Sequence, residues 1–103
     1  MYILYNLDIK EMRKFSFNKD KNEKLQRERG VSFQQVINCL EADQELDVIK
    51  HPNSKYSNQQ IFVVEINDYV YAVPFVEKEN EYFLKTIFPS RKLTKKYLTK
   101  KPG

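Results

Sequence analysis

The sequence has only two glycines, Gly30 and Gly103, among its 103 residues. A loop that cradles phosphate needs several glycines close together, so this class of nucleotide site is excluded. One cysteine, Cys39, rules out an intramolecular disulfide, and the simplest prediction is a cytoplasmic protein. No apolar run approaches the roughly 20 residues of a membrane-spanning helix, and no signal-peptide core opens the chain.

Histidine is as scarce as cysteine, because His51 is the only one. A structural zinc site needs about four ligands, so one His and one Cys far apart in sequence predict no metal site and no cofactor. No Gly-rich turn surrounds a serine and no Cys–His pair is implied, which argues against a nucleophilic enzyme. We expect Cys39 to be a thiol at the edge of the core.

Charge is abundant but unevenly distributed along the chain. Residues 30–88 hold four Lys and Arg against nine Asp and Glu, whereas residues 89–103 hold six basic residues and no acidic one. A basic end beside an acidic middle indicates an anionic partner. The alternative is a solvated surface helix with a Lys-rich tail.

The first half of the chain carries clear helix signals. Residues 14–17 alternate polar and aromatic, which predicts a short strand with both Phe rings inward. Asn18 is an N-cap for a charged surface helix over 19–28, and Gly30 is its left-handed C-cap. Ser32 and Gln35 form a capping box for the next helix. Its buried stripe consists of residues at helical spacing: Phe33, Val36, Ile37 and Leu40.

The sequence pattern of the second half of the chain predicts strands. Residues 46–49, 60–66, 69–77 and 81–88 are predicted to be extended, with Asn67-Asp68 as a tight type I′ turn. Pro74 has no backbone N–H to donate a hydrogen bond to a neighbouring strand, so it predicts that its strand lies at an edge of the sheet or contains a bulge there. The apolar and aromatic segment 83–88 is typical of a packed strand. Ser90 then caps a basic helix that reaches about Leu98.

These elements predict one α+β domain over residues 1–103, with residues 1–12 as a dispensable extension or a short extra element. Two N-terminal helices pack on one face of a curved antiparallel sheet of about four to five strands, followed by a C-terminal basic helix.

The remaining candidates for chemistry are cationic and aromatic. Lys and Arg neutralise phosphates, while tyrosine rings stack on bases and their hydroxyls move protons. Tyr69 and Tyr71 share one face of a strand. The alternative is that the tyrosines are half-buried sheet residues and the cations serve solubility.

Two stretches resemble the BrnT family of bacterial toxins. Phe17-Asn-Lys-Asp-Lys21-Asn22 followed by Arg29-Gly30-Val31-Ser32-Phe33 is similar to the opening of that family. A hairpin, a strand, Arg91 and a basic helix resemble its ending, so the similarity covers about residues 13–98. The chain departs from the pattern at Glu28, Arg29 and Pro89, where the family usually has Lys, His and Ser.

The resemblance implies a RelE-like fold and a type II toxin–antitoxin system with metal-independent cleavage of RNA. The partner would be a small DNA-binding antitoxin, often of ribbon-helix-helix type, in a complex that contains a toxin homodimer. Such an endoribonuclease uses the 2′-hydroxyl of RNA as its nucleophile.

Residue roles follow partly from the resemblance and partly from chemistry. Lys21 matches the family's helix Lys, and Arg91 matches its Arg after the last strand; we expect Arg91 to clamp the phosphate. Lys85 or Lys21 assists, and Tyr71 or His51 is the acid or base. Glu65 is an alternative base if its side chain faces the same cleft. The residues expected to bind RNA are Lys21, Lys24, Arg29, Ser90, Lys92, Lys95 and Lys96. The rival hypothesis is a non-catalytic nucleic-acid-binding or protein-interaction module.

Overall fold

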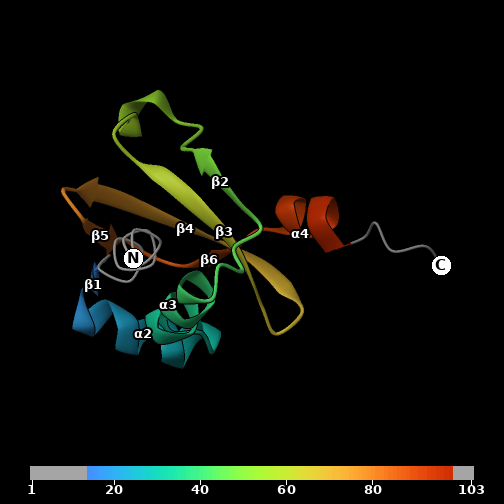
Figure 1. The fold of residues 1–103 in the computed structure, drawn as a ribbon. Coiled ribbons are helices and arrows are strands. Elements are labelled where there is room, and N and C mark those ends of the chain that lie inside the picture. The colour runs from blue at the N-terminus through green and yellow to red at the C-terminus, as the bar shows by residue number, and fades with distance from the viewer. Residues whose placement is uncertain (1–13, 99–103) are drawn as a thin grey trace, which may run out of the picture.

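The computed structural model describes residues 14–98, and the prediction for residues 1–12 lies outside this range. The described part is α+β, with three helices and a sheet of six strands (Figure 1). In chain order the elements are β1 (Lys14–Phe17), α2 (Lys19–Arg29), α3 (Phe33–Glu41), β2 (Asp47–Lys50), the 3-10 turn η1 (Ser54–Tyr56), β3 (Gln60–Ile66), β4 (Tyr69–Lys78), β5 (Glu81–Leu84), β6 (Phe88–Pro89) and α4 (Arg91–Leu98).

Local capping signals set the ends of the first two helices, as the sequence predicted. The Asn18 side chain accepts a hydrogen bond from the Lys21 N–H at the start of α2. Gly30 ends α2 at φ 69°, in the left-handed region that favours glycine. Ser32 and Gln35 exchange both bonds of the capping box at the start of α3.

The sheet is mixed, so the prediction of an antiparallel sheet was wrong in this respect. Its order is β1-β5-β4-β3-β2, and β6 also pairs with β4. β1 runs parallel to β5, its neighbour, whereas the other pairs are antiparallel. The direction of β1 depends on a partner more than 60 residues later in the chain, which local sequence patterns do not report.

Helices α2 and α3 cover one face of the sheet, which we call the α3 face. Side chains alternate between the two faces of a strand, and Phe62, Val64 and Ile66 of β3 point to the α3 face, where they join the core of α2 and α3. Phe33 is fully buried there, and its ring stacks on Phe17 at a centroid distance of 4.9 Å. This core therefore holds β1, α3 and the central strands together.

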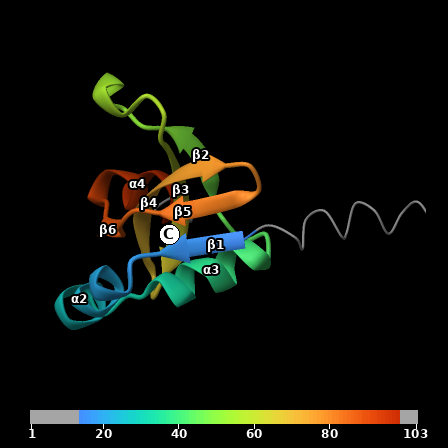
Figure 2. The same ribbon diagram turned by 90° about the vertical axis from the view of Figure 1, so that its left-hand side faces the viewer.

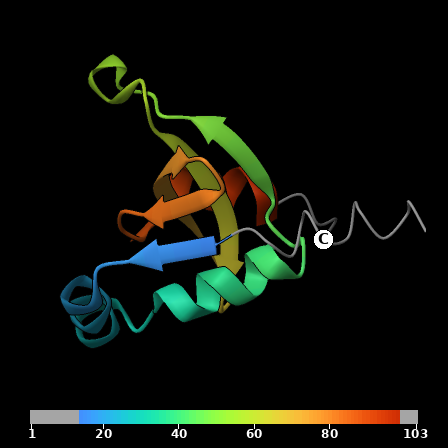
Figure 3. The ribbon, with the colours of Figure 1, turned by 60° about the vertical axis from the view of Figure 1, so that its left-hand side comes forward.

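Helix α4 lies on the opposite face, which we call the α4 face (Figure 3). It begins at the edge of β4, because the Ser90 N–H bonds to the Val70 carbonyl. It ends near β2, where the Tyr97 hydroxyl donates to Asp47. Asp47 is opposite Val63 in the sheet register, and Val63 belongs to the face away from α3. The two N-terminal helices therefore share one face of the sheet, and α4 packs on the other.

Pro74 interrupts the pairing of β4 with β5 and β6. It lies in the central strand β4, and its carbonyl accepts the Lys85 N–H from the side where β5 and β6 pair. Because N–H and C=O of one strand residue point the same way, Pro74 leaves this side without a donor. The ladder stops after Leu84 and resumes at Phe88, so the single strand predicted over 81–88 is two strands.

The β3–β4 connection is the tight turn that the sequence predicted. Asn67 and Asp68 have φ values of 53° and 66°, as a two-residue type I′ hairpin requires. The turn aligns Ile66 with Tyr69. The same register pairs Phe62 with Val73, and both of these residues belong to the core on the α3 face.

Phe33→Ala should lower the free energy of unfolding by about 3–5 kcal/mol, because the deleted ring leaves a cavity under α3. Urea denaturation followed by circular dichroism measures the loss. Phe88→Ala is the matched control, since 36% of Phe88 is exposed and its truncation should cost only about 1–2 kcal/mol. Equal losses for the two variants would contradict the assigned core.

Candidate nucleic-acid interface

Helix α4 is divided into an anchoring side and a cationic side. Leu93, Thr94, Tyr97 and Leu98 are partly buried against the sheet. The exposed residues are all basic: Arg91, Lys92, Lys95 and Lys96. They form two pairs at i,i+4 spacing, which makes one continuous strip along the helix. We call these four residues the cationic strip.

Three polar side chains hold α4 in place. Ser90 caps the helix, because its hydroxyl accepts the Leu93 N–H at 3.1 Å. The Thr94 hydroxyl accepts the Val70 N–H at 3.0 Å and donates to the Ser90 carbonyl at 2.7 Å. The Thr94 hydroxyl thereby serves as the hydrogen-bond partner of a β4 backbone N–H next to the end of β6. The predicted RNA-binding residue Ser90 thus has a local structural role.

The Tyr97–Asp47 hydrogen bond, 2.6 Å long, ties the other end of α4 to β2. The same carboxylate also accepts the Val48 N–H at 2.8 Å. The Tyr97 hydroxyl, the Val48 N–H and the positive charge of Lys96 together lower the pKa of Asp47. Conversely, the hydrogen bond to Asp47 raises the pKa of Tyr97, because the donor proton is retained.

The cationic strip is unfavourable for α4 taken alone. Like charges at i,i+4 cost a few tenths of a kcal/mol per pair. Arg91 and Lys92 occupy the first turn, where the positive end of the helix dipole disfavours cations. No acidic residue lies in α4 to offset these terms. A polyanion at this surface would reverse the balance.

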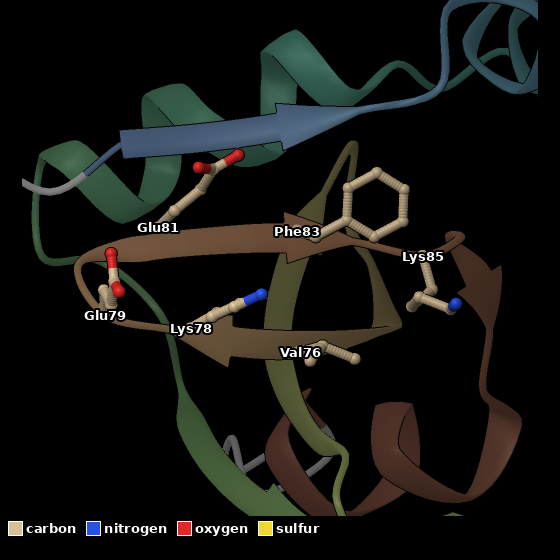
Figure 4. A pocket seen from close by; sticks show the side chains of 6 residues that line it. All are labelled: Val76, Lys78, Glu79, Glu81, Phe83 and Lys85. Carbon is tan, nitrogen blue, oxygen red and sulfur yellow. The ribbon is translucent and has the colours of Figure 1, made fainter.

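Lys85 lies on the same side of the sheet as α4. Its ammonium is 5.5 Å from the centre of the Phe83 ring. Both residues line an open hollow of about 480 Å³ on the β4–β5 hairpin (Figure 4). The other lining residues are Val76, Lys78, Glu79 and Glu81. The structure therefore places predicted Lys85 and the cationic strip, including Arg91, on one face.

Tyr71 and Arg29 lie on the other side. The half-buried Tyr71 ring packs against the α3-face core and contacts Tyr69 edge-on at 5.8 Å. The Arg29 guanidinium donates to the Ile87 carbonyl in the β5–β6 connection. This bond joins the last residue of α2 to the β5–β6 connection. Arg29 consequently has a structural contact beside any role in binding RNA.

His51 lies in the loop between β2 and β3, which extends away from the rest of the sheet (Figures 1 and 2). Its Nδ1 accepts the Asn53 N–H at 3.2 Å, and its ring is 4.8 Å from Tyr56. Asp47, which contacts α4, lies at the opposite end of β2. The structure therefore separates His51 from the cationic strip. Lys21 and Lys24 lie on α2, away from α4.

Two exposed aromatic residues were missed in the sequence. Phe83 and Phe88 are 37% and 36% exposed, although an apolar segment predicted a packed strand there. They pair with Val76 and Ala72 of β4, which share the α4 face. Pro74 signals the break in the ladder between these two residues, but no signal in the sequence reports their exposure.

Other classes of site lack support in the described range. Within residues 14–98, no group of three or more His, Cys, Asp or Glu side chains is arranged to hold a metal ion. Burial, and then the charges of Glu45 and Glu65, raise the pKa of the Cys39 thiol, which disfavours a reactive thiolate. No helix in this range has the length and apolarity to cross a membrane.

Comparisons with protein-family models, curated proteins and solved structures found no match for this chain. The BrnT resemblance accordingly depends on the sequence motifs alone.

The Tyr97–Asp47 bond predicts a pH-dependent anchor for α4. Asp47 has a lowered folded-state pKa, so its contribution is complete above about pH 4 and disappears as pH falls through the folded value. Tyr97→Phe should therefore lower the melting temperature at pH 7, and the difference from wild type should shrink as the pH is lowered below about 4. Thermal unfolding as a function of pH measures this. A difference that does not shrink in acid would contradict the assignment.

At alkaline pH the same hydrogen bond is lost through the other partner, Tyr97. Tyr97 has a raised pKa, so its contribution persists below about pH 10 and is lost as pH rises above its folded value. Tyr56→Phe, in the exposed β2–β3 loop, should leave the melting temperature unchanged in both limits.

Proposed function

We propose that this protein binds RNA through the cationic strip of α4 and cleaves it as the toxin of a toxin–antitoxin pair. The observation that supports binding most strongly is the strip itself: four exposed cations on one helix that has no acidic residue. Cleavage, the RelE-like fold and a DNA-binding antitoxin follow from the BrnT resemblance and belong to the same proposal. A cytoplasmic location, inferred from the single cysteine, also belongs to it.

The binding step is electrostatic. Each Lys or Arg that neutralises a phosphate releases counterions, so affinity should fall steeply with salt. Arg91 begins α4 directly after the cap residue Ser90, whose hydroxyl fixes the first turn. A guanidinium at a fixed position binds two phosphate oxygens at once and keeps its charge at any physiological pH. These properties favour Arg91 as the phosphate clamp.

The cleavage step would use a nucleophile that the RNA itself supplies. The 2′-hydroxyl attacks the adjacent phosphorus, the P–O5′ bond breaks, and a 2′,3′-cyclic phosphate and a 5′-hydroxyl form. Arg91 would stabilise the charge on the phosphoryl oxygens, with Lys85 assisting from the same face. A proton must leave the 2′-hydroxyl and another must reach the 5′-oxygen; Tyr71 and His51 remain the proposed groups for these transfers.

RNA binding without cleavage is the second candidate. It is favoured by the placement of the proposed acid–base groups: Tyr71 packs on the α3 face, and His51 lies in the β2–β3 loop. In this case the protein would be an RNA-binding or antitoxin-binding module with the same cationic strip.

Arg91→Ala should reduce metal-independent cleavage of total cellular RNA by about 100-fold or more, as loss of a charge-stabilising group does. The assay contains EDTA and separates the products by gel electrophoresis. Lys19→Ala, which removes an exposed cation from α2 that is in no proposed site, is the matched control and should leave cleavage within about twofold. Intact RNA with wild-type protein, under conditions where binding is measured, would refute the ribonuclease and leave the second candidate.

Binding is tested separately by the salt dependence of affinity. For single-stranded RNA, each lost phosphate contact should reduce the slope of log K against log salt by about 0.7. Arg91→Ala combined with Lys92→Ala should therefore lower the slope by about 1.4, whereas Lys19→Ala combined with Arg27→Ala on α2 should not change it. Salt-independent or absent binding by wild type would refute the cationic strip as an RNA site.

A further inference from the structure

The two exposed phenylalanines on the α4 face, Phe83 and Phe88, are not part of the hydrophobic core. Phe83 and Phe88 lie on β5 and β6, and their register partners Val76 and Ala72 place both rings on the side that carries α4. Exposed aromatic rings of this size cost hydration free energy, since burial of such a side chain is worth about 1.5–3 kcal/mol. Their position on the face that carries α4 calls for a physical explanation.

Cations alternate with these rings along the chain. Lys85 lies between them in sequence and contacts the Phe83 ring at 5.5 Å, and Arg91 follows Phe88 at the start of α4. Figure 4 labels both Phe83 and Lys85 among the side chains that line the hollow. Proteins that bind single-stranded nucleic acid combine these elements, because bases stack on aromatic rings while cations follow the backbone.

We propose that Phe83 and Phe88 form a stacking platform for two unpaired bases of a single-stranded RNA, a proposal that builds on RNA binding by the cationic strip. The RNA backbone would pass Lys85 and Arg91 on its way to the rest of α4. The protein would then prefer single strands to duplexes, whose bases are unavailable for stacking on protein rings.

The spacing of the rings supports an extended strand. Their partners Val76 and Ala72 are four residues apart on β4, which corresponds to roughly 13 Å. Consecutive bases in a helical stack are only about 3.4 Å apart. One stacked pair of neighbouring bases therefore cannot contact both rings, and the strand must be extended between them.

Two acidic residues indicate in which direction the RNA backbone would run from the hollow. Glu79 and Glu81 line the hollow on the side of the β4–β5 turn, and a Glu81 carboxylate oxygen accepts the Ser16 hydroxyl at 2.9 Å. These two carboxylates outnumber Lys78, which lines the same end of the hollow, so phosphate is disfavoured there. The backbone is thereby directed from Lys85 toward α4, while the carboxylates are suited to accept hydrogen bonds from base amino groups.

The absence of tryptophan makes a direct test simple. Phe83→Trp introduces a single indole, whose fluorescence should be quenched by a single-stranded 10-mer RNA as a base stacks on it. Tyr56→Trp is the matched control: Tyr56 is 39% exposed but lies in the β2–β3 loop, so its indole should not respond. A 10-mer with abasic nucleotides, which has the same charge, should not quench Phe83→Trp.

Affinity supplies the second readout. Phe83→Leu and Phe88→Leu should each weaken binding of the intact 10-mer by about fivefold or more. Binding of the abasic 10-mer and of an RNA duplex should stay within twofold, because the cations are unchanged. Phe83→Trp should retain wild-type affinity, which shows that its fold and surface charge are intact.

The outcomes separate this inference from the proposed function. Salt-sensitive RNA binding with no quenching of Phe83→Trp and no effect of the Leu variants would overturn the platform and leave the cationic strip standing. Absence of RNA binding by wild type at low salt would overturn both. If sedimentation shows a wild-type dimer that Phe83→Leu dissociates, without any change in RNA affinity, the rings form a protein interface and the platform is refuted.

Discussion

Pro74 is the constraint on which the second half of the fold depends. A central strand normally bonds to neighbours on both sides along its whole length, but β4 has no donor at this position. The neighbouring ladder is interrupted between β5 and β6, and the Lys85 N–H alone bridges the gap to the Pro74 carbonyl. The interruption separates Phe83 from Phe88 and leaves β6 as a two-residue strand. β6 then leads directly into the capped start of α4.

The surface that results has an unusual combination of features for so small a protein. One side of the sheet is closed by α2 and α3 over a continuous apolar core. The other side presents a helix with four exposed cations next to two exposed aromatic rings. Thr94 and Tyr97 anchor that helix with hydrogen bonds to β4 and β2. Charge held in place by such an anchor costs less ordering entropy on binding than the same charge on a flexible tail.

Sequence patterns predicted the features that depend on neighbouring residues. The caps at Asn18 and Ser32, the Gly30 terminus and the Asn67-Asp68 turn are all local signals, and the structure confirms each of them. Features that depend on distant partners were missed. The parallel direction of β1 depends on β5, and the break after Leu84 depends on a proline in another strand.

The candidate site was predictable to a similar degree. The four cations of α4 were evident from charge alone, but their anchor joins Tyr97 to Asp47, 50 residues earlier, and no local pattern reports such a pair. Phe83 and Phe88 look like core residues in a linear pattern because period-two alternation does not reveal whether a sheet face is covered. The roles of Lys85, Tyr71 and His51 remain predictions, since only Lys85 shares a face with the strip.

The measurement that tests the central claim most directly is a map of backbone amide chemical shifts during titration with a single-stranded RNA 10-mer. The account predicts that the largest shifts lie in α4 and in the segment from Phe83 to Ser90, with little change in α2. Shifts concentrated in α2 or in the β2–β3 loop would contradict it, because RNA would then bind a surface that lacks both the cationic strip and the exposed rings.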